Sequence, residues 1–331
     1  MTLGRVAAAL VLVGLWLLAC PADLFAWTPG THIYLGEMAL ANLHLLPPAI
    51  ASLLHAFPYD YLYGIIAPDT SIAKKYVPPG RHSHFWTVGR ETFDVAESDA
   101  LRAFGLGYLS HLAADTVAHN YFVPRQLLLT SSTKTMGHTY WESRIETHLG
   151  DRYARMAREI ILRDQTGANQ HLERIISPTI FSVRTNRRIF RGMVHLAHTK
   201  GWQRAMQAVR ERSRWLLTEG DLELHFGTAY NLTMEMLAAA EGQMDKVIAL
   251  ALDPNGAQAL RAAKRLRRQV LSVGQLGSPS RLLDLAEENF GILPLELGYW
   301  TESKVPRPWR ESSDAAPAEK DTRRLILPAG D

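Results

Sequence analysis

Three side chains that can hold a divalent cation stand at a four-residue spacing in the middle of the chain. His111, Asp115 and His119 occupy positions i, i+4 and i+8 of the run HLAADTVAH. On an α-helix this spacing places all three side chains on one face, here among apolar neighbours. A buried, unpaired aspartate is costly, whereas a divalent cation would keep it ionised. The pattern indicates a metal site, and a hydrogen-bonded His–Asp pair in the core with an exposed histidine is the alternative.

A second histidine–carboxylate pair, His138 and Glu142, follows at the same i, i+4 spacing. Taken alone, this pair is more typical of an exposed helix surface than of a metal site. The other candidates are equally ambiguous one by one, since carboxylates are common in turns and histidines in cores. They are Asp69 after Pro68, His84 with His82 as its alternative, and His32, five residues after Trp27.

The elements that must position these side chains are predicted to be helical. The chain lacks convincing period-two alternation and shows helical periodicity over most of its length, so the expected fold class is all-α. Helices are expected over residues 30–45, 98–123 and 137–149, and near 152–163, 193–217, 229–252, 255–273 and 280–290. Pro124 is expected to end the second helix, and three prolines predict a loop over 67–80.

Composition narrows the class of protein. The chain has 331 residues, of which 47% are hydrophobic and 21% charged, which excludes a disordered or collagen-like protein. A net charge of +3 is too small to indicate a nucleic-acid binder. Because Cys20 is the only cysteine, an intrachain disulfide and a cysteine-rich zinc site are both excluded. Nine of the 13 histidines fall between His32 and His148, in the part that carries the candidate ligands.

The first 26 residues have the pattern of a secretory signal peptide. Arg5 precedes an apolar run over residues 6–20, which is short for a membrane span, and Ala26 is an acceptable cleavage site. We therefore expect export to the periplasm or the extracellular space. Two alternatives stay open: lipoprotein anchoring at Cys20, and an uncleaved anchor.

Together the candidates resemble the zinc-dependent phospholipase C family, which shares its all-helical fold with the fungal single-strand nucleases. The resemblance covers about residues 27–150 and rests on nine positions in the family's order. These are Trp27, His32, Asp69, His84, His111, Asp115, His119, His138 and Glu142. The chain has three residues between Asp115 and His119, where the family usually has five. We therefore expect the helix to run straight on to His119.

The resemblance implies up to three zinc ions. Asp69, His84, His111 and Asp115 would hold the first, and His119, His138 and Glu142 the second. Trp27, through its free amine and carbonyl, would hold the third with His32 and Asp115. Removal of the signal peptide would then be an activation step, because an internal Trp27 has no free amine. Asp69 is the implied catalytic residue, which would orient or deprotonate a metal-activated water.

The implied function is that of an exported zinc-dependent phosphodiesterase, a phospholipase C acting on phospholipids. The first alternative is a single-strand nuclease or nucleotidase on the same scaffold, favoured by the short spacing from Trp27 to His32. Only that alternative implies a nucleic-acid partner. The second alternative is a non-catalytic zinc-binding envelope protein. The expected partners are a phospholipid or other phosphodiester substrate and peripheral contact with a membrane surface, and no obligate protein partner is inferred.

The expected domain organisation has four parts: a signal peptide (1–26), a zinc-binding helical core (27–175), a helical C-terminal region packing on that core (176–302) and a flexible tail (303–331). Basic clusters at 184–188 and 264–268 are typical either of solvated helix faces or of surfaces that attract phosphates. A further histidine group matches no family pattern and is a weak ligand candidate. It consists of His195, His198, Glu223 and His225.

Overall fold

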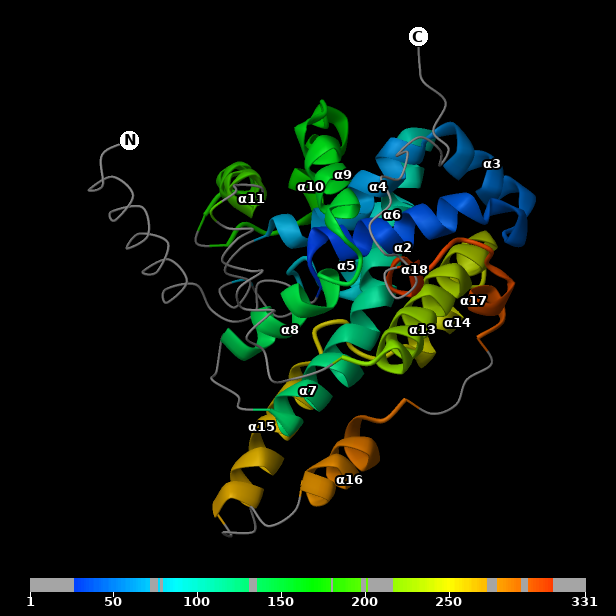
Figure 1. The fold of residues 1–331 in the computed structure, drawn as a ribbon. Coiled ribbons are helices and arrows are strands. Elements are labelled where there is room, and N and C mark those ends of the chain that lie inside the picture. The colour runs from blue at the N-terminus through cyan, green and yellow to red at the C-terminus, as the bar shows by residue number, and fades with distance from the viewer. Residues whose placement is uncertain are drawn as a thin grey trace.

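The computed structural model describes residues 27–71, 77, 80–130, 136–179, 181–197, 201, 217–272, 279–292 and 297–311. Throughout these ranges the regular elements are helices or short helical turns, and they contain no strand (Figure 1). The predicted all-α class is therefore confirmed. The predicted signal peptide, including Cys20, lies outside the described residues.

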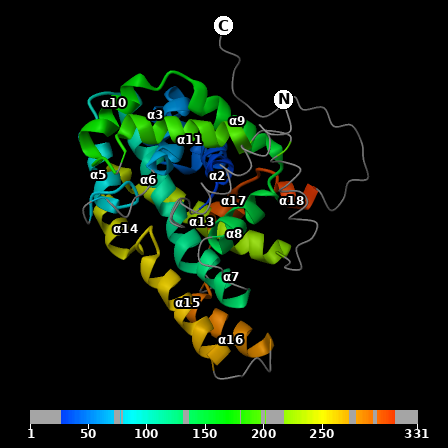
Figure 2. The ribbon, with the colours of Figure 1, turned by 90° about the vertical axis from the view of Figure 1, so that its left-hand side faces the viewer.

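The elements follow one another as helices joined by short turns. Their bounds are α2 (Pro29–Ala41), η1 (Leu43–Leu45), α3 (Pro48–Ala56), α4 (Pro58–Ile66), η2 (Ala67–Thr70), α5 (Trp86–Asp94), α6 (Asp99–Val117), η4 (Ala118–Phe122), α7 (Val123–Leu129), α8 (Met136–Glu146), α9 (Asp151–Leu162), α10 (Thr166–Ile175), α11 (Val183–Ala197), α13 (Glu219–Ala238), η5 (Ala239–Glu241), α14 (Met244–Leu250), α15 (Ala257–Ser272), α16 (Pro279–Phe290), α17 (Gly298–Glu302) and α18 (Pro308–Glu311). Helices α9, α10 and α11 lie at one end of the molecule, and α15 and α16 at the other (Figure 2).

Helix α6 is the central element and carries two of the candidate ligands. Ser98 caps its first turn, with its hydroxyl accepting a hydrogen bond from the backbone N–H of Leu101 at 3.3 Å. From Ala103 to Val117 every residue is buried, because α4, α5 and α13 pack around the helix. A helix that is buried all round must satisfy its polar side chains internally.

Two glycines allow α4 and α6 to pack with their backbones nearly in contact. A Cβ added at Gly107 would lie 2.0 Å from the Tyr61 carbonyl oxygen, and one at Gly64 would lie 2.1 Å from the Phe104 carbonyl oxygen. Any side chain at either position would push the two helices apart. This close packing fixes the ligands on α6 relative to η2, which directly follows α4.

The predicted end of the helix at Pro124 is wrong. After α6 the chain makes the π-helical turn η4, and α7 begins at Val123 with Pro124 in its first turn. A proline is tolerated there because the N–H groups of the first turn have no partner within the helix. The expected helix over 229–252 is also interrupted, since Gly242 adopts a left-handed φ of +109° between η5 and α14.

The C-terminal helices share the hydrophobic core of the N-terminal ones. Phe226 and Tyr230 of α13 are fully buried, and α13 packs against both α6 and α2. Within the tail expected from residue 303, Ser303, Arg307 and Trp309 are buried. Trp309 is 2% exposed and lies parallel to Trp300 at a ring distance of 6.2 Å. The rest of that tail, residues 312–331, lies outside the described residues, and the division of the chain at residue 175 stays a prediction.

Helix α11 begins at Val183, ten residues before the helix expected over 193–217, and most of residues 198–216 lie outside the described ranges. Among the described residues, no helix is long and apolar enough to cross a membrane.

Candidate metal centre

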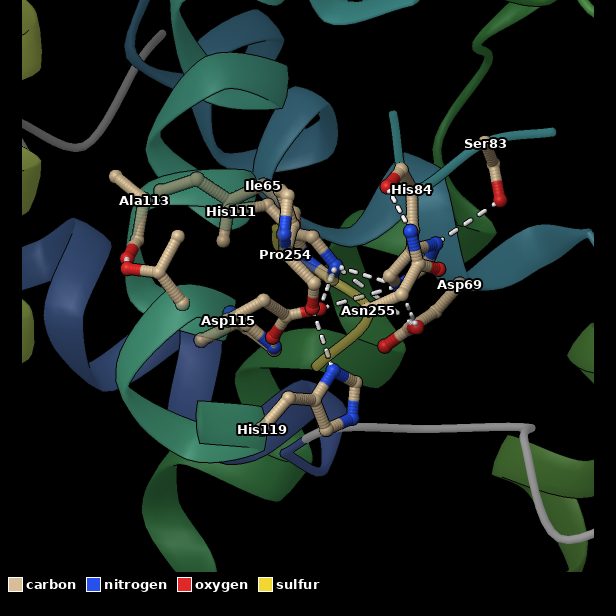
Figure 3. Close-up of polar contacts among 12 residues, drawn as sticks. Ile65, Asp69, Ser83, His84, His111, Ala113, Asp115, His119, Pro254 and Asn255 are labelled. Carbon is tan, nitrogen blue, oxygen red and sulfur yellow. Dashed lines mark hydrogen bonds and ion pairs between the residues drawn. The ribbon is translucent and has the colours of Figure 1, made fainter. Parts of the chain in front are cut away.

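Asp115 lies at the centre of a cluster of three imidazoles. Its carboxylate oxygens are 3.1 Å from His111 Nε2, 3.2 Å from His84 Nε2 and 3.3 Å from His32 Nε2. All four side chains are almost completely buried. They come from three places in the fold, because α2 carries His32, α6 carries His111 and Asp115, and His84 precedes α5. Figure 3 shows His84, His111 and Asp115 pointing toward one another.

Asp69 lies close to two imidazoles of the same cluster, those of His84 and His111. Its Oδ1 lies 3.3 Å from His84 Nε2 and 3.9 Å from His111 Nε2. The Nε2 atoms of His84 and His111 are themselves 3.1 Å apart. Asp69, His84 and His111 thus form one buried donor group, and His32, His111 and Asp115 form another. The two groups share His111, so this imidazole lies between two possible cation positions.

A third donor group lies further along the same chain segment. His119, His138 and Glu142 are buried and place one donor atom each within 4.8 Å of one another. His138 Nε2 is 2.7 Å from Glu142 Oε1, and the ring of His138 is edge-on to that of His119 at 5.2 Å. His138 and Glu142 of α8 therefore form a buried group with His119 of η4 and are not an exposed pair.

The chain stays helical from Asp115 to His119, as expected, but the type of helix changes on the way. The α-helix ends at Val117, and His119 lies in the π-helical turn η4. A π-turn adds a residue to each turn and changes the direction of the side chains that follow, which is common at functional sites. From this turn His119 reaches the donor group that it shares with His138 and Glu142.

Several of the ligand candidates are oriented by a contact through Nδ1. His111 Nδ1 lies 2.7 Å from the Ile65 carbonyl oxygen, and His119 Nδ1 lies 2.6 Å from that of Pro254. A carbonyl accepts only, so both imidazoles carry their proton on Nδ1 when neutral and present Nε2 as a lone pair. This is the arrangement expected of histidines that bind a metal.

The carboxylates of the cluster favour a positive charge between them: burial lowers the pKa of His111, but Asp115 and Asp69 outweigh burial and raise it. Burial alone would raise the pKa of Asp115, but His111 and the close imidazoles of His32 and His84 hold that pKa well below its usual value. Burial also lowers the pKa of His119 to about 4, so this imidazole is neutral at physiological pH. Neutral histidine and ionised aspartate are the protonation states that metal binding requires.

The donor set fits zinc. Neither carboxylate oxygen of Asp115 and neither ring nitrogen of His32 has a hydrogen bond of normal geometry, although all four atoms are buried. Such atoms are costly to bury without a partner. Imidazole nitrogen and carboxylate oxygen are ligands that zinc accepts in proteins, and a cation at this position would satisfy both residues.

Two further predicted residues border the cluster. Trp27 is fully buried, and its indole lies 6.2 Å from the His32 ring and 5.6 Å from the Phe226 ring. The start of the helical core therefore lies beside His32, which the family resemblance assigns to the same zinc as Trp27. The role of the Trp27 amine stays a prediction. His82 belongs to none of the donor groups, and its Nδ1 accepts a hydrogen bond from the backbone N–H of His84 at 3.1 Å.

The histidine group proposed outside the family pattern does not come together in the described residues. Glu223 accepts hydrogen bonds from the indoles of Trp300 and Trp309, and His225 Nδ1 lies 2.7 Å from the Asp221 carbonyl oxygen. His195 is exposed on α11. His198 lies outside the described residues.

Sequence reasoning missed the turn that covers the cluster from the C-terminal half. Pro254 contacts His119, and Asn255 Nδ2 donates a hydrogen bond to the His84 carbonyl oxygen at 2.7 Å (Figure 3). Gly256 follows with a left-handed φ of +54°, and a Cβ there would lie 2.2 Å from the His119 carbonyl oxygen. The run DPNG at residues 253–256 predicts a turn, but nothing in the sequence indicates what this turn contacts.

Comparison with known proteins agrees with this geometry. Residues 31–184 match the family model of zinc-dependent phospholipase C. No curated protein and no solved structure gives a significant match. The predicted resemblance to this family is therefore confirmed over residues 31–184, and zinc is the cofactor that the family's description names. The matched segment includes eight of the nine candidate ligands, all except Trp27.

Proposed function

We propose that the protein is a zinc-dependent phosphodiesterase of the phospholipase C type, which hydrolyses a phospholipid to diacylglycerol and a phosphorylated headgroup. One observation carries the proposal: two carboxylates, Asp69 and Asp115, meet around the same pair of buried imidazoles within the family-matched segment. A purely structural role would not need this concentration of buried ionisable groups.

Zinc held by these groups would neutralise charge on the phosphate and make water more acidic. Asp69 is the proposed general base. Its carboxylate would accept a proton from the attacking water as the water oxygen forms a bond to phosphorus. The bond from phosphorus to the glycerol oxygen breaks, and that oxygen takes up a proton to give diacylglycerol. The residues around Asp69 keep the carboxylate in place, because η2 is anchored to α6 by close helix packing.

We also propose that the chain is exported and cleaved after Ala26. The support is the signal-like pattern of residues 1–26 together with the burial of Trp27 beside His32. N-terminal sequencing of the protein recovered from its native compartment tests this, and a mature chain beginning at Trp27 is expected. A chain that begins at Cys20 would support lipoprotein anchoring instead.

The activity is tested with a panel of substrates on protein beginning at Trp27. Release of phosphocholine from phosphatidylcholine is expected in the wild type and is expected to fall at least about a hundredfold in Asp69→Asn. His55→Ala is the matched control, because His55 is exposed and lies outside the donor groups. Cleavage of single-stranded DNA or a nucleoside 3′-monophosphate without lipid hydrolysis would support the nuclease alternative. No turnover of any substrate by zinc-loaded protein would support the non-catalytic one.

A further inference from the structure

A cavity of about 540 Å³ lies between α9, α10 and α11, and none of the candidate metal ligands lines it. Its lining has an unusual charge, since five arginines face two carboxylates. The arginines are Arg163, Arg184, Arg187, Arg188 and Arg191, and the carboxylates are Asp164 and Glu173. The described lining contains no lysine. A concave site with a net charge of +3 concentrates anions from solution.

Arg187 is the buried member of this group. It is 9% exposed, and its Nη2 forms an ion pair with Glu173. Its Nη1 is buried and has no hydrogen bond of normal geometry within the described part of the chain. A charged donor that is removed from water without an acceptor is costly, and a single exposed carboxylate does not satisfy both terminal nitrogens. Glu173 and the neutral Tyr63 phenol are thus the polar neighbours of this guanidinium, and among the described residues its Nη1 has no anionic acceptor.

The two acidic side chains do not neutralise the site. Asp164 accepts hydrogen bonds from the backbone N–H and the hydroxyl of Thr166, which turns it toward the start of α10. Glu173 is exposed and pairs with Arg187 alone among the described residues. Three exposed arginines on α11, Arg184, Arg188 and Arg191, have no ion pair within the described residues.

The uncharged part of the cavity wall combines apolar side chains (Ile161, Leu162 and Phe190) with neutral polar ones. The Tyr63 hydroxyl donates a hydrogen bond to Asn169 Oδ1 at 2.6 Å. Burial raises the pKa of Tyr63 to about 12, so the phenol stays protonated and adds no negative charge. Beside it lies Thr70 of η2, the residue that follows Asp69. The same turn therefore contributes to the metal centre and to the cavity wall.

We propose that this cavity binds the phosphate group of a phosphate ester. Planar guanidinium groups match the oxygens of a phosphate in pairs, and arginine rather than lysine is the residue suited to such two-point contacts. The volume exceeds that of inorganic phosphate and leaves room for the alcohol to which the phosphate is attached. Both a soluble ester and the headgroup of an anionic lipid carry this chemistry. The inference rests on the residues of the cavity and does not depend on the proposed hydrolysis.

Calorimetric titration of the zinc-loaded, full-length mature protein with glycerol 3-phosphate tests the site. We expect Arg187→Gln to weaken binding at least about tenfold, because it removes the buried charged donor. Arg174→Gln is the matched control, since Arg174 is an exposed arginine of α10 that does not line the cavity. Equal affinity of wild type and Arg187→Gln, together with loss of binding in Asp115→Ala, would place the phosphate at the metal centre and overturn the proposal.

A second variant keeps the test informative if Arg187→Gln does not fold. Glu173→Gln removes the only carboxylate paired with Arg187 among the described residues, so it is expected to tighten phosphate binding several-fold. Unchanged or weaker binding in Glu173→Gln would count against the site, because a ligand on Arg187 must compete with Glu173.

Vesicles distinguish the two sources of the phosphate. Co-sedimentation is compared for vesicles of phosphatidylcholine alone and with added phosphatidic acid. If Arg187→Gln loses affinity for the soluble ester, the ligand class is a soluble phosphate ester. If it loses only the binding that depends on phosphatidic acid, the ligand is a lipid headgroup. If Arg187→Gln changes neither measurement relative to Arg174→Gln, the proposal is wrong.

Discussion

The Nε2 atoms of His84 and His111 lie 3.1 Å apart, with their rings nearly perpendicular, although 27 residues separate them in the chain. When His111 is neutral its proton lies on Nδ1, toward the Ile65 carbonyl oxygen, so its Nε2 presents a lone pair to His84. Asp69 and Asp115 lie on either side of this pair. A cation between the four groups would relieve the crowding of lone pairs.

Removal of zinc is expected to destabilise the fold. The carboxylate of Asp115 and the imidazole of His32 would then remain buried without normal hydrogen bonds, so the melting temperature should fall when a chelator is added and recover when zinc is returned. Differential scanning calorimetry measures both changes. In Asp115→Ala the response to the chelator should be smaller, and an undiminished response in that variant would contradict the placement of zinc at Asp115.

The turn after α14 is expected to tune the metal centre without binding the metal. Asn255→Ala removes the hydrogen bond to the His84 carbonyl oxygen, which loosens the backbone that presents this imidazole. We expect zinc affinity to fall roughly tenfold, as is usual when a group that orients a ligand is lost. Competition with a zinc-binding dye measures it. Asn289→Ala is the control because Asn289 is exposed and bonds only within its own helix among the described contacts, and equal losses in both variants would contradict this role.

A side chain at Gly107, where α4 and α6 approach most closely, is expected to destabilise the fold. Gly107→Ala would place a Cβ 2.0 Å from the Tyr61 carbonyl oxygen, so the helices must separate at a cost of roughly 1–3 kcal/mol or more. Chemical denaturation measures the loss. Gly192→Ala is the contrasting variant, because Gly192 on α11 faces open space and alanine should stabilise the helix there by up to about 1 kcal/mol. Equal effects at the two positions would show that the helices are not in close contact.

Glu146 is expected to make stability depend on pH. Burial raises its pKa to about 7 from an ordinary value of 4.5, against the opposing backbone hydrogen bonds of Thr31 and Gly30. Between these two values the folded chain binds more protons than the unfolded chain, so stability falls as the pH rises through this window. Glu146→Gln should remove this part of the pH dependence, on the order of 3 kcal/mol in total. Glu159→Gln, at an exposed position, should leave it unchanged.

The free energy of unfolding of the wild type, Glu146→Gln and Glu159→Gln is measured by denaturant titration at pH 5, 6, 7 and 8. A slope that persists in Glu146→Gln would assign the pH dependence to another group.

The candidate ligands could be predicted because their spacing carries the information. His111 and Asp115, and likewise His138 and Glu142, are one helical turn apart, so a local rule places each pair on one face. Their family pattern then predicts which distant pairs meet. The same local rules failed at Pro124, because a proline that can end one helix can also begin the next, and the sequence does not say which.

Contacts made through backbone carbonyls could not be predicted from the sequence. The carbonyls of Ile65 and Pro254 orient two of the histidines, and a carbonyl is present at every position regardless of side chain. The arginine cavity was visible only as a basic cluster on α11. Its partners on α4, α9 and α10 are set by packing that no spacing in the chain reveals.

Phosphocholine release measured against the amount of zinc bound per chain tests the central claim most directly. The metal-free mature protein should release none, and activity should rise with bound zinc and stay absent in Asp115→Ala at every zinc concentration. Release that does not depend on zinc, or that survives undiminished in Asp115→Ala, would contradict a hydrolytic centre built around this carboxylate.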